Sequence, residues 1–294
     1  MKDKTSKSYW IHALSPLHVG SGRGVGHIDL PIAREKVTNW PYIPGSALKG
    51  VIADHHDASA GKGREDCAKK KAAFGTAGDD SSNAGALVFS DARIVCLPVQ
   101  SLYGTFAWCT SPMVLRQLIR DLTGIVPGLE DLKVPSLSGE KALASKKTVL
   151  GDDTLYLQDL DVPMEGCDYV GKWAEFLAGQ VFPEDEGWRG EFDKRFVVLS
   201  DEVFNYLSEM GTQVDARIRI DPENGVVATG GLWYEEALPA EAVLAGMVWC
   251  DKVTVKGVSE DELVKGFCSG KLCLQVGGKA TVGRGRVSLS FQEE

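Results

Sequence analysis

A glycine-rich loop near the start of the chain is the first stretch whose residues could do chemistry. Gly20, Gly22, Gly24 and Gly26 stand at every second position, so no side chain keeps a ligand away from the backbone N–H groups. Consecutive amides of this kind suit phosphate oxygens, of a nucleotide or of a nucleic-acid backbone, and the spacing does not choose between them. Because the loop runs into the segment from His27 to Pro31 instead of opening a helix, it is not a dinucleotide-binding fingerprint. A surface loop without a ligand is the alternative.

A second anion site is predicted where the first helix begins. Ser46 can cap a helix whose buried stripe is Leu48, Val51 and Ile52. Lys49 lies on the other face of the first turn, so a cation and the free amides of the helix terminus point to the same place. A solvated lysine on a surface helix is the alternative.

Two stretches in the last third of the chain add basic and aromatic side chains. Residues 277–286 (GGKATVGRGR) are glycine-rich and basic, but they lack the GxxxxGK[ST] spacing of a P-loop. Residues 213–220 alternate between apolar and charged side chains and lead into the turn sequence DPENG, which predicts a β-hairpin. Trp233 and Tyr234 near its base could stack on bases, although aromatic residues near a strand end more often belong to a core.

Composition limits the classes of function. The 294 residues are 44% hydrophobic and 25% charged, which is ordinary for a globular protein of one large or two modest domains. No apolar run approaches the roughly 20 residues that span a bilayer, and the polar N-terminus is unlike a secretory signal. We therefore expect a cytoplasmic protein that binds no membrane. The seven cysteines are scattered without a CxxC pair, which indicates reduced thiols rather than disulfides or a zinc site.

The net charge of −9 argues against a protein that binds nucleic acid through bulk electrostatics. Its distribution matters more than its sum. Acidic residues are concentrated in the segment 152–193, whereas basic residues gather beside the glycine-rich stretches. This asymmetry permits a local basic groove on an acidic body.

The elements that must position these residues follow from hydrophobic periodicity and capping signals. Their order, a strand, a helix, a strand pair, inserted material, a helix and a strand, is the βαββαβ order of a ferredoxin-like or RNA-recognition fold. We expect one principal α+β core with appended lobes. Segment 58–85, small, charged and glycine-rich, is predicted to be a mobile insertion. Strands are predicted at 9–14, 86–97, 102–109, 148–157, 196–199, 213–220, 226–236, 242–255, 272–276 and 287–291, and helices after Ser46, Ser111 and Ser200, near 173–177 and from a capping box at Ser259 and Glu262.

Several motifs occur in the order found in one known family. They are LHVGSG, GHIDLPIARE, PYIPGSALKG, SDARI, TSPMVL, ARIRI, GGLWYEE and GGKATVGRGRV. In these motifs the chain resembles the RAMP superfamily of CRISPR effector proteins, most closely the fourth Cmr subunits that form the repeated backbone of type III-B complexes. The resemblance covers nearly the whole chain, residues 1–294 as a single RAMP domain, and is weakest at 58–85 and 163–195.

The resemblance implies an RNA-recognition-like palm with an inserted finger region and a β-hairpin thumb, residues 213–236. It implies copies stacked head to tail along a guide CRISPR RNA, with other Cmr subunits and a single-stranded target RNA as further partners. Segment 16–50 then holds the active-site loop and the first helix, and 277–286 is an RNA-binding loop. Sequence specificity would come from pairing with the guide.

The resemblance also assigns residues to roles. Asp29, by itself a turn aspartate before proline, matches the aspartate that cleaves target RNA, and His18, Glu235 and Glu236 match positions near the cleavage site. Where the family often has an aromatic residue after the paired glutamates, this chain has Ala237. RNA contacts are expected from the loops, the first helix and the hairpin: Gly20, Ser21, Gly22, Arg34, Ser46, Lys49, Arg217, Trp233, Lys279 and Arg284.

Cleavage by the RNA's own 2′-hydroxyl fits a single carboxylate. Asp29 could orient that hydroxyl or bind a divalent metal, magnesium or manganese, that does so. No cluster of carboxylates for two-metal hydrolysis is evident in the sequence. Two other hypotheses remain open: a non-catalytic RNA-binding scaffold of the same complex, and a guide-processing nuclease using some of the five histidines, all of which lie in the first fifth of the chain.

Overall fold

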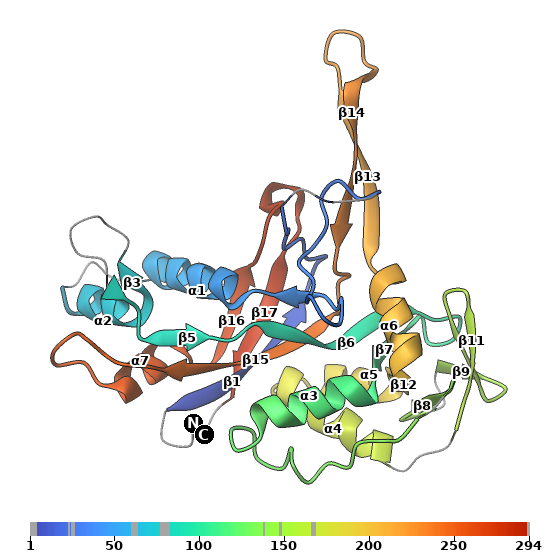
Figure 1. Cartoon of the computed structure of the whole chain (residues 1–294), viewed down its shortest axis with the longest axis horizontal. Helices are drawn as coiled ribbons and strands as arrows, with labels where there is room; N and C mark the ends of the chain where they lie inside the picture. The colour runs from blue at the N-terminus through green and yellow to red at the C-terminus, as the bar shows by residue number, and fades with distance from the viewer. Residues whose placement is uncertain are drawn as a thin grey trace.

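A ten-stranded sheet forms the body of the molecule (Figure 1). The computed structural model describes residues 5–22, 24, 27–59, 64–76, 83–137, 139–146, 149–165 and 169–292. The main path of the sheet runs β16 (Lys271–Gln275), β17 (Arg286–Phe291), β1 (Ser6–Ala13), β15 (Val243–Cys250), β6 (Ala92–Gln100), β7 (Phe106–Thr110), β12 (Phe196–Leu199) and β8 (Ala142–Ala144), with β2 (Tyr42–Ile43) on β6 and β5 (Leu87–Phe89) on β15. β7 and β12 pair in parallel, and the other neighbours are antiparallel, so the sheet is mixed.

Each face of the sheet has its own hydrophobic core, because successive residues of a strand point to opposite sides. On β1, Tyr9 and Ile11 join the core under α1 (Gly45–Ser59) and α7 (Glu260–Phe267). Trp10 points the other way and joins Trp108, α3 (Pro112–Leu122) and α4 (Tyr169–Val181). Figure 1 shows α1 above the sheet and α3 and α4 below it. This mixed architecture agrees with the predicted α+β class.

The predicted helix caps are present except at the first helix. The side chains of Ser111, Ser200 and Ser259 each accept a backbone N–H of the helix that follows them. α1, however, begins at Gly45, whose N–H donates to Asp91 Oδ1 at 2.9 Å. A Cβ on Gly45 would lie 2.2 Å from the carbonyl oxygen of Phe89, so the chain enters the helix where only glycine fits, and Asp91 takes the capping role predicted for the serine that follows.

The described part of segment 58–85 is largely folded. It contains α2 (Arg64–Phe74) and the short pair β3 (Gly75–Thr76) and β4 (Asn83–Ala84); residues 60–63 and 77–82 lie outside the described residues. Further elements that the sequence did not reveal are β11 (Leu160–Pro163), which joins β9 (Leu150–Gly151) and β10 (Thr154–Leu157) in a small sheet, and α5 (Glu186–Arg195). Among the described residues, no helix is long and apolar enough to cross a membrane.

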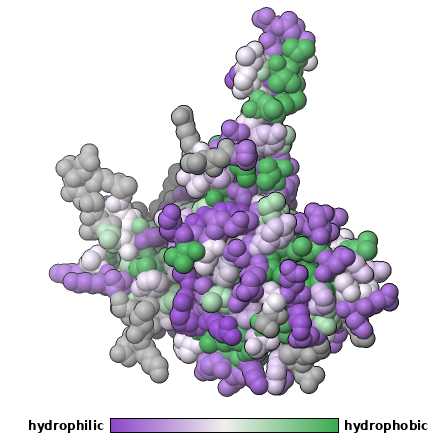
Figure 2. Space-filling model, turned by 45° about the vertical axis from the view of Figure 1, so that its right-hand side comes forward, coloured by the Kyte–Doolittle hydropathy of each residue, from purple (hydrophilic) through white to green (hydrophobic). Residues whose placement is uncertain are grey.

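A long hairpin, β13 (Gln213–Ile220) and β14 (Val227–Ala237), projects from the body after α6 (Asp201–Met210) (Figure 1). We call it the projecting hairpin. Its strands match the predicted hairpin. The hydropathy surface in Figure 2 shows apolar residues along it, and Val214, Ile218 and Leu232 are about half exposed, at 46%, 52% and 54%. Its base, not its tip, meets the glycine-rich loops.

Candidate active site and nucleic-acid interface

Asp29 lies on the edge of β14 at the base of the projecting hairpin. Its Oδ2 accepts the backbone N–H of Tyr234 at 2.8 Å. The next residue continues the pairing, because Leu30 donates its N–H to the carbonyl of Tyr234 (3.1 Å) and accepts the N–H of Glu236 (3.0 Å). The carboxylate is exposed. One oxygen is thus fixed by the protein, and the other has no partner among the described residues and remains for a ligand.

His18 lies behind this segment. The N–H of Ala33 donates to the carbonyl of Val19 at 2.8 Å, which places the strand-like segment 17–21 beside the segment that carries Asp29. The ring of His18 is buried, and its Nδ1 donates to the carbonyl of Glu236 at 2.7 Å. This bond leaves Nε2 as the ring nitrogen for any other partner. Sequence positions 18, 29 and 236 therefore meet in one place.

The terminal glycine-rich loop packs against the same place. The N–H of Gly278 donates to the carbonyl of His18 at 2.9 Å. Gly277 has φ +79°, and a Cβ there would lie 2.4 Å from that carbonyl oxygen. Residues 280–282 then form a short 3-10 turn, η2 (Ala280–Val282). The loop is held to the segment that carries His18 by backbone contacts that only glycine permits.

Glu235 joins the terminal loop to the hairpin. It is 3% exposed, and its Oε1 accepts from Lys279 Nζ at 2.6 Å and from the indole Nε1 of Trp233 at 2.7 Å. Arg217 Nε lies 3.4 Å from Oε2. Burial raises the pKa of the Glu235 carboxyl, but these three donors together outweigh burial, so the net pKa lies below its usual range. Three predicted RNA contacts are thus gathered around one carboxylate.

Arg284 forms the second link between loop and hairpin. Its Nη2 pairs with Asp215 on β13, and the residue is 5% exposed. Its Nε and Nη1 are buried without a hydrogen-bond partner among the described residues. Asp215 was not among the predicted site residues, although its place on the charged face of an alternating strand is the signal that could have identified it.

The remaining predicted residues divide between two places. Ser21 and Gly22 are exposed on the first loop, of which residues 23, 25 and 26 lie outside the described residues, and Gly20 pairs with Ile32. Ser46 is exposed in the first turn of α1. Lys49 in the same turn donates to the carbonyls of Leu87 (2.7 Å) and Gly85 (3.5 Å), and burial lowers its pKa. These donations direct its ammonium toward β5 rather than toward the hairpin.

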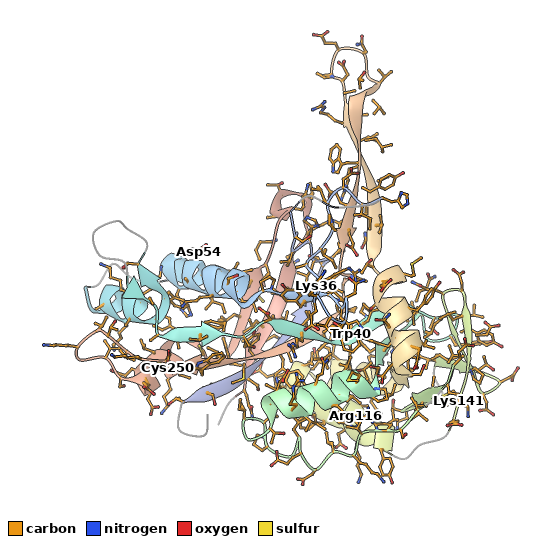
Figure 3. All side chains as sticks on the ribbon, viewed as in Figure 1. Lys36, Trp40, Asp54, Arg116, Lys141 and Cys250 are labelled. Atoms are coloured by element: carbon orange, nitrogen blue, oxygen red, sulfur yellow. The ribbon has the colours of Figure 1, made fainter. Side chains whose placement is uncertain are left out.

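Arg34 and Glu236 face each other across the base of the hairpin, with Arg34 Nη2 2.6 Å from Glu236 Oε1. The loop that follows Arg34 carries Lys36 and Trp40, labelled at the foot of the hairpin in Figure 3. Trp40 Nε1 donates to Asn205 Oδ1 of α6 at 3.2 Å, so this loop is attached to α6.

The site fits a divalent metal only if RNA supplies most of the ligands. The described residues contain no group of three or more histidine, cysteine, aspartate or glutamate side chains that could hold an ion. Asp29 offers one oxygen not engaged by Tyr234. Magnesium is commonly bound through one or two carboxylates together with substrate phosphates, so this donor set is compatible with a metal shared between Asp29 and RNA.

A family model described as the RAMP superfamily matches residues 10–288. The chain belongs to the RAMP superfamily. It is 34% identical over 296 residues to the CRISPR system Cmr endoribonuclease Cmr4 of Pyrococcus furiosus, covering 96% of this chain and 94% of that protein. It is 24% identical to the CRISPR system CMR subunit Cmr4 of Saccharolobus solfataricus, covering 97% of this chain and 96% of that protein.

Solved structures show the same RAMP fold. The crystal structure of oligomeric Cmr4 from Pyrococcus furiosus superimposes with a TM-score of 0.73 at 25% identity, over 98% of each chain. A chain of the type III-B Cmr-beta complex bound to cognate target RNA superimposes with a TM-score of 0.73 at 22% identity, over 98% of this chain and 97% of that chain. The likeness extends over both the body and the projecting hairpin, since nearly the whole chain is covered.

The buried Glu235 carboxylate predicts a pH dependence for this RAMP chain. Because its folded-state pKa is lowered, its contribution to stability is present above the unfolded-state pKa, about 4.3, and is lost as pH falls through the folded-state pKa. Glu235→Gln is expected to reduce the free energy of unfolding by about 1–3 kcal/mol at pH 7. Thermal melts from pH 7 to pH 3 would show the difference between wild type and variant shrinking below about pH 4. A constant difference would contradict the assignment.

Proposed function

We propose that this chain is the repeated backbone subunit of a type III-B CRISPR RNA-guided complex, and that it binds guide RNA and cuts complementary target RNA. The observation that carries the proposal is the exposed carboxylate of Asp29, held at the base of the projecting hairpin beside the basic terminal loop. Support comes from the 34% identity over 96% of the chain to a protein named an endoribonuclease.

The reaction we propose is attack of a 2′-hydroxyl on the adjacent phosphorus. The 2′-oxygen forms a bond to phosphorus, the bond from phosphorus to the 5′-oxygen breaks, the 2′-proton is lost and the leaving oxygen gains a proton. Asp29 would align the 2′-hydroxyl or accept its proton through the oxygen that Tyr234 leaves free. Magnesium or manganese, shared between Asp29 and RNA, would supply charge stabilisation at the phosphate. The products are a 2′,3′-cyclic phosphate and a 5′-hydroxyl.

The arrangement of the strands and helices supports the proposal that the chain has an RNA-recognition-like palm and a β-hairpin thumb. Neighbouring strands in the large sheet are β17, β1, β15 and then β5 with β6, while α1 follows β1 and α7 follows β15 along the chain. This is the arrangement of a βαββαβ unit, which an RNA-recognition-like palm requires. The helices α3, α4 and α5 and the small sheet β9 to β11 would be the inserted finger region, and the projecting hairpin the thumb. Copies would associate head to tail along a guide CRISPR RNA with other Cmr subunits, as an open heterologous contact allows.

A cleavage assay on the reconstituted complex tests this function. We expect regularly spaced products from complementary single-stranded RNA with magnesium or manganese, and none with a chelator or with non-complementary RNA. Treatment with a phosphatase that acts on 2′,3′-cyclic ends should identify the cyclic phosphate. Complementary RNA that binds but stays intact at every metal concentration would leave the alternative, a non-catalytic RNA-binding scaffold of the same complex. Cleavage of repeat RNA by the isolated chain would instead indicate guide processing.

A further inference from the structure

We infer that Arg34 and Glu236 are a positioning pair, which holds the segment that presents Asp29 against the base of the projecting hairpin. The inference rests on the proposed function, because it concerns the placement of the proposed catalytic carboxylate. It assigns to both residues a role different from the RNA contact and the place in the catalytic machinery expected from the family resemblance.

Glu236 uses both carboxylate oxygens inside the protein. Oε2 accepts the backbone N–H of Ile32 at 3.0 Å. Oε1 accepts from Arg34 Nη2 at 2.6 Å and from Thr212 Oγ1 at 2.9 Å. The residue is 2% exposed. A carboxylate enclosed by three donors and closed to solvent does not touch RNA, so its effect on the reaction must pass through the groups it holds.

Arg34 connects three elements. Its Nη1 donates to the carbonyl of Asn39 in its own loop at 2.8 Å and to the carbonyl of Ser208 in α6 at 3.1 Å. Its Nη2 reaches Glu236 on β14. The side chain is 16% exposed. Both terminal nitrogens are therefore engaged with protein oxygens, which is the bonding of a structural tie rather than of a phosphate contact.

The path from this pair to Asp29 is short. Glu236 binds the backbone at Ile32, three residues after Asp29, and its own N–H donates to the carbonyl of Leu30. The same main chain of β14 supplies the Tyr234 N–H that fixes Asp29 Oδ2. If the ion pair is lost, one buried charge remains without its partner, and the segment loses its tie at position 34 while its backbone hydrogen bonds at Leu30 and Ala33 remain. A displacement of about 1 Å can slow an oriented reaction by about 100-fold.

Single-turnover cleavage in the reconstituted complex tests the pair. Glu236→Gln keeps an acceptor for Ile32 but removes the charge, and Arg34→Lys keeps the charge but replaces the two terminal nitrogens of the guanidinium with a single ammonium. We expect each to slow cleavage by about 10- to 100-fold at saturating complex, with the Kd for target RNA within about twofold of wild type. Glu241→Gln is the matched control, since Glu241 pairs with His12 at 2.6 Å in another part of the sheet, and it should leave the rate unchanged.

Combining Glu236→Gln with Asp29→Ala shows whether the pair acts by positioning Asp29 or in some other way. If the pair acts through Asp29, adding Glu236→Gln to Asp29→Ala leaves the residual rate unchanged; a further fall of the same size overturns the inference. A raised Kd with a normal rate at saturation also overturns it, because Arg34 would then be an RNA contact. Asp29→Ala cleaving at the wild-type rate would instead refute the proposed catalytic role of Asp29, independently of the pair.

A variant that perturbs Glu236 less tests the inference if the ion-pair variants fail to assemble into the complex. Thr212→Val removes one donor to Glu236 and leaves the ion pair in place, so the complex should form. A smaller loss of rate, about two- to fivefold, is expected for the removal of a single neutral hydrogen bond. An unchanged rate in this variant, together with failure of the ion-pair variants to assemble, would show that the pair serves stability alone and would overturn the inference.

Discussion

Replacing Asp29 with alanine is expected to slow target-RNA cleavage by at least about 100-fold, the range found when a positioned acid–base group is removed. Folding and assembly should be unaffected. The side chain is exposed, and its one hydrogen bond to the described residues is to the N–H of Tyr234, which also lies near solvent. Asp29→Asn should behave in the same way, because the amide oxygen can still accept from Tyr234 whereas the charge is gone.

The measurement is single-turnover cleavage of a labelled target by complexes that contain each variant, with the Kd for target RNA measured separately. Asp54→Ala is a suitable control, since Asp54 is an exposed aspartate on α1 (labelled in Figure 3). Wild-type cleavage by Asp29→Asn would contradict a role for the charge, and wild-type cleavage by both variants would remove Asp29 from the reaction.

Replacing Gly277 with alanine is expected to detach the terminal loop from the segment that carries His18. Its φ of +79° disfavours a side chain, and the added Cβ would lie 2.4 Å from the carbonyl oxygen of His18. The conformational strain alone costs about 1–2 kcal/mol, and the clash must be relieved by moving the backbone that donates from Gly278 to His18. Since the same loop carries Lys279 and Arg284, guide-RNA affinity should fall by tenfold or more, as 1.4 kcal/mol per factor of ten implies.

Gly283 provides the matched control within the same loop. It has φ +80°, but nothing lies within 4 Å of an added Cβ, so Gly283→Ala includes the strain without the clash. Thermal melting of the free chain and fluorescence anisotropy with guide RNA would compare the two variants. Equal effects in both would show that the contact with His18 contributes nothing to the loop.

The sequence allowed the projecting hairpin and most helix starts to be predicted because their signals are local. Strict alternation in residues 213–220, the turn after Asp221 and the side chains of Ser111, Ser200 and Ser259 act within a few residues of the chain. The structure begins α1 at Gly45, two residues before the predicted start at Ala47, because its cap, Asp91, is 46 positions away from Gly45. The hydrophobic periodicity of a sequence does not reveal a hydrogen bond between residues so far apart in the chain.

The candidate site was predictable as a set of residues but not as a set of contacts. The glycine loops and Asp29 were recognisable, and the structure places His18, Asp29 and Glu236 together. Thr212 was missed because an isolated threonine has no distinguishing pattern until its partner is known, and Asp215 was missed because the charged face of its strand does not show which loop it will meet. The bonds of Arg34 to three separate elements could likewise not be read from its position in the chain.

Glu235 and Glu236 are neighbours in sequence, yet they point to opposite sides of β14, one to the terminal loop and the other to the segment that carries Asp29. Inserting or deleting one residue between Tyr234 and Ala237 would exchange the two sides and break both attachments at once. Length variation among related hairpins should therefore be confined to the outer part beyond Ile218, where the strand register already shifts. The length of the hairpin can vary at its tip, whereas the number of residues at its base must stay the same for Glu235 and Glu236 to keep their sides.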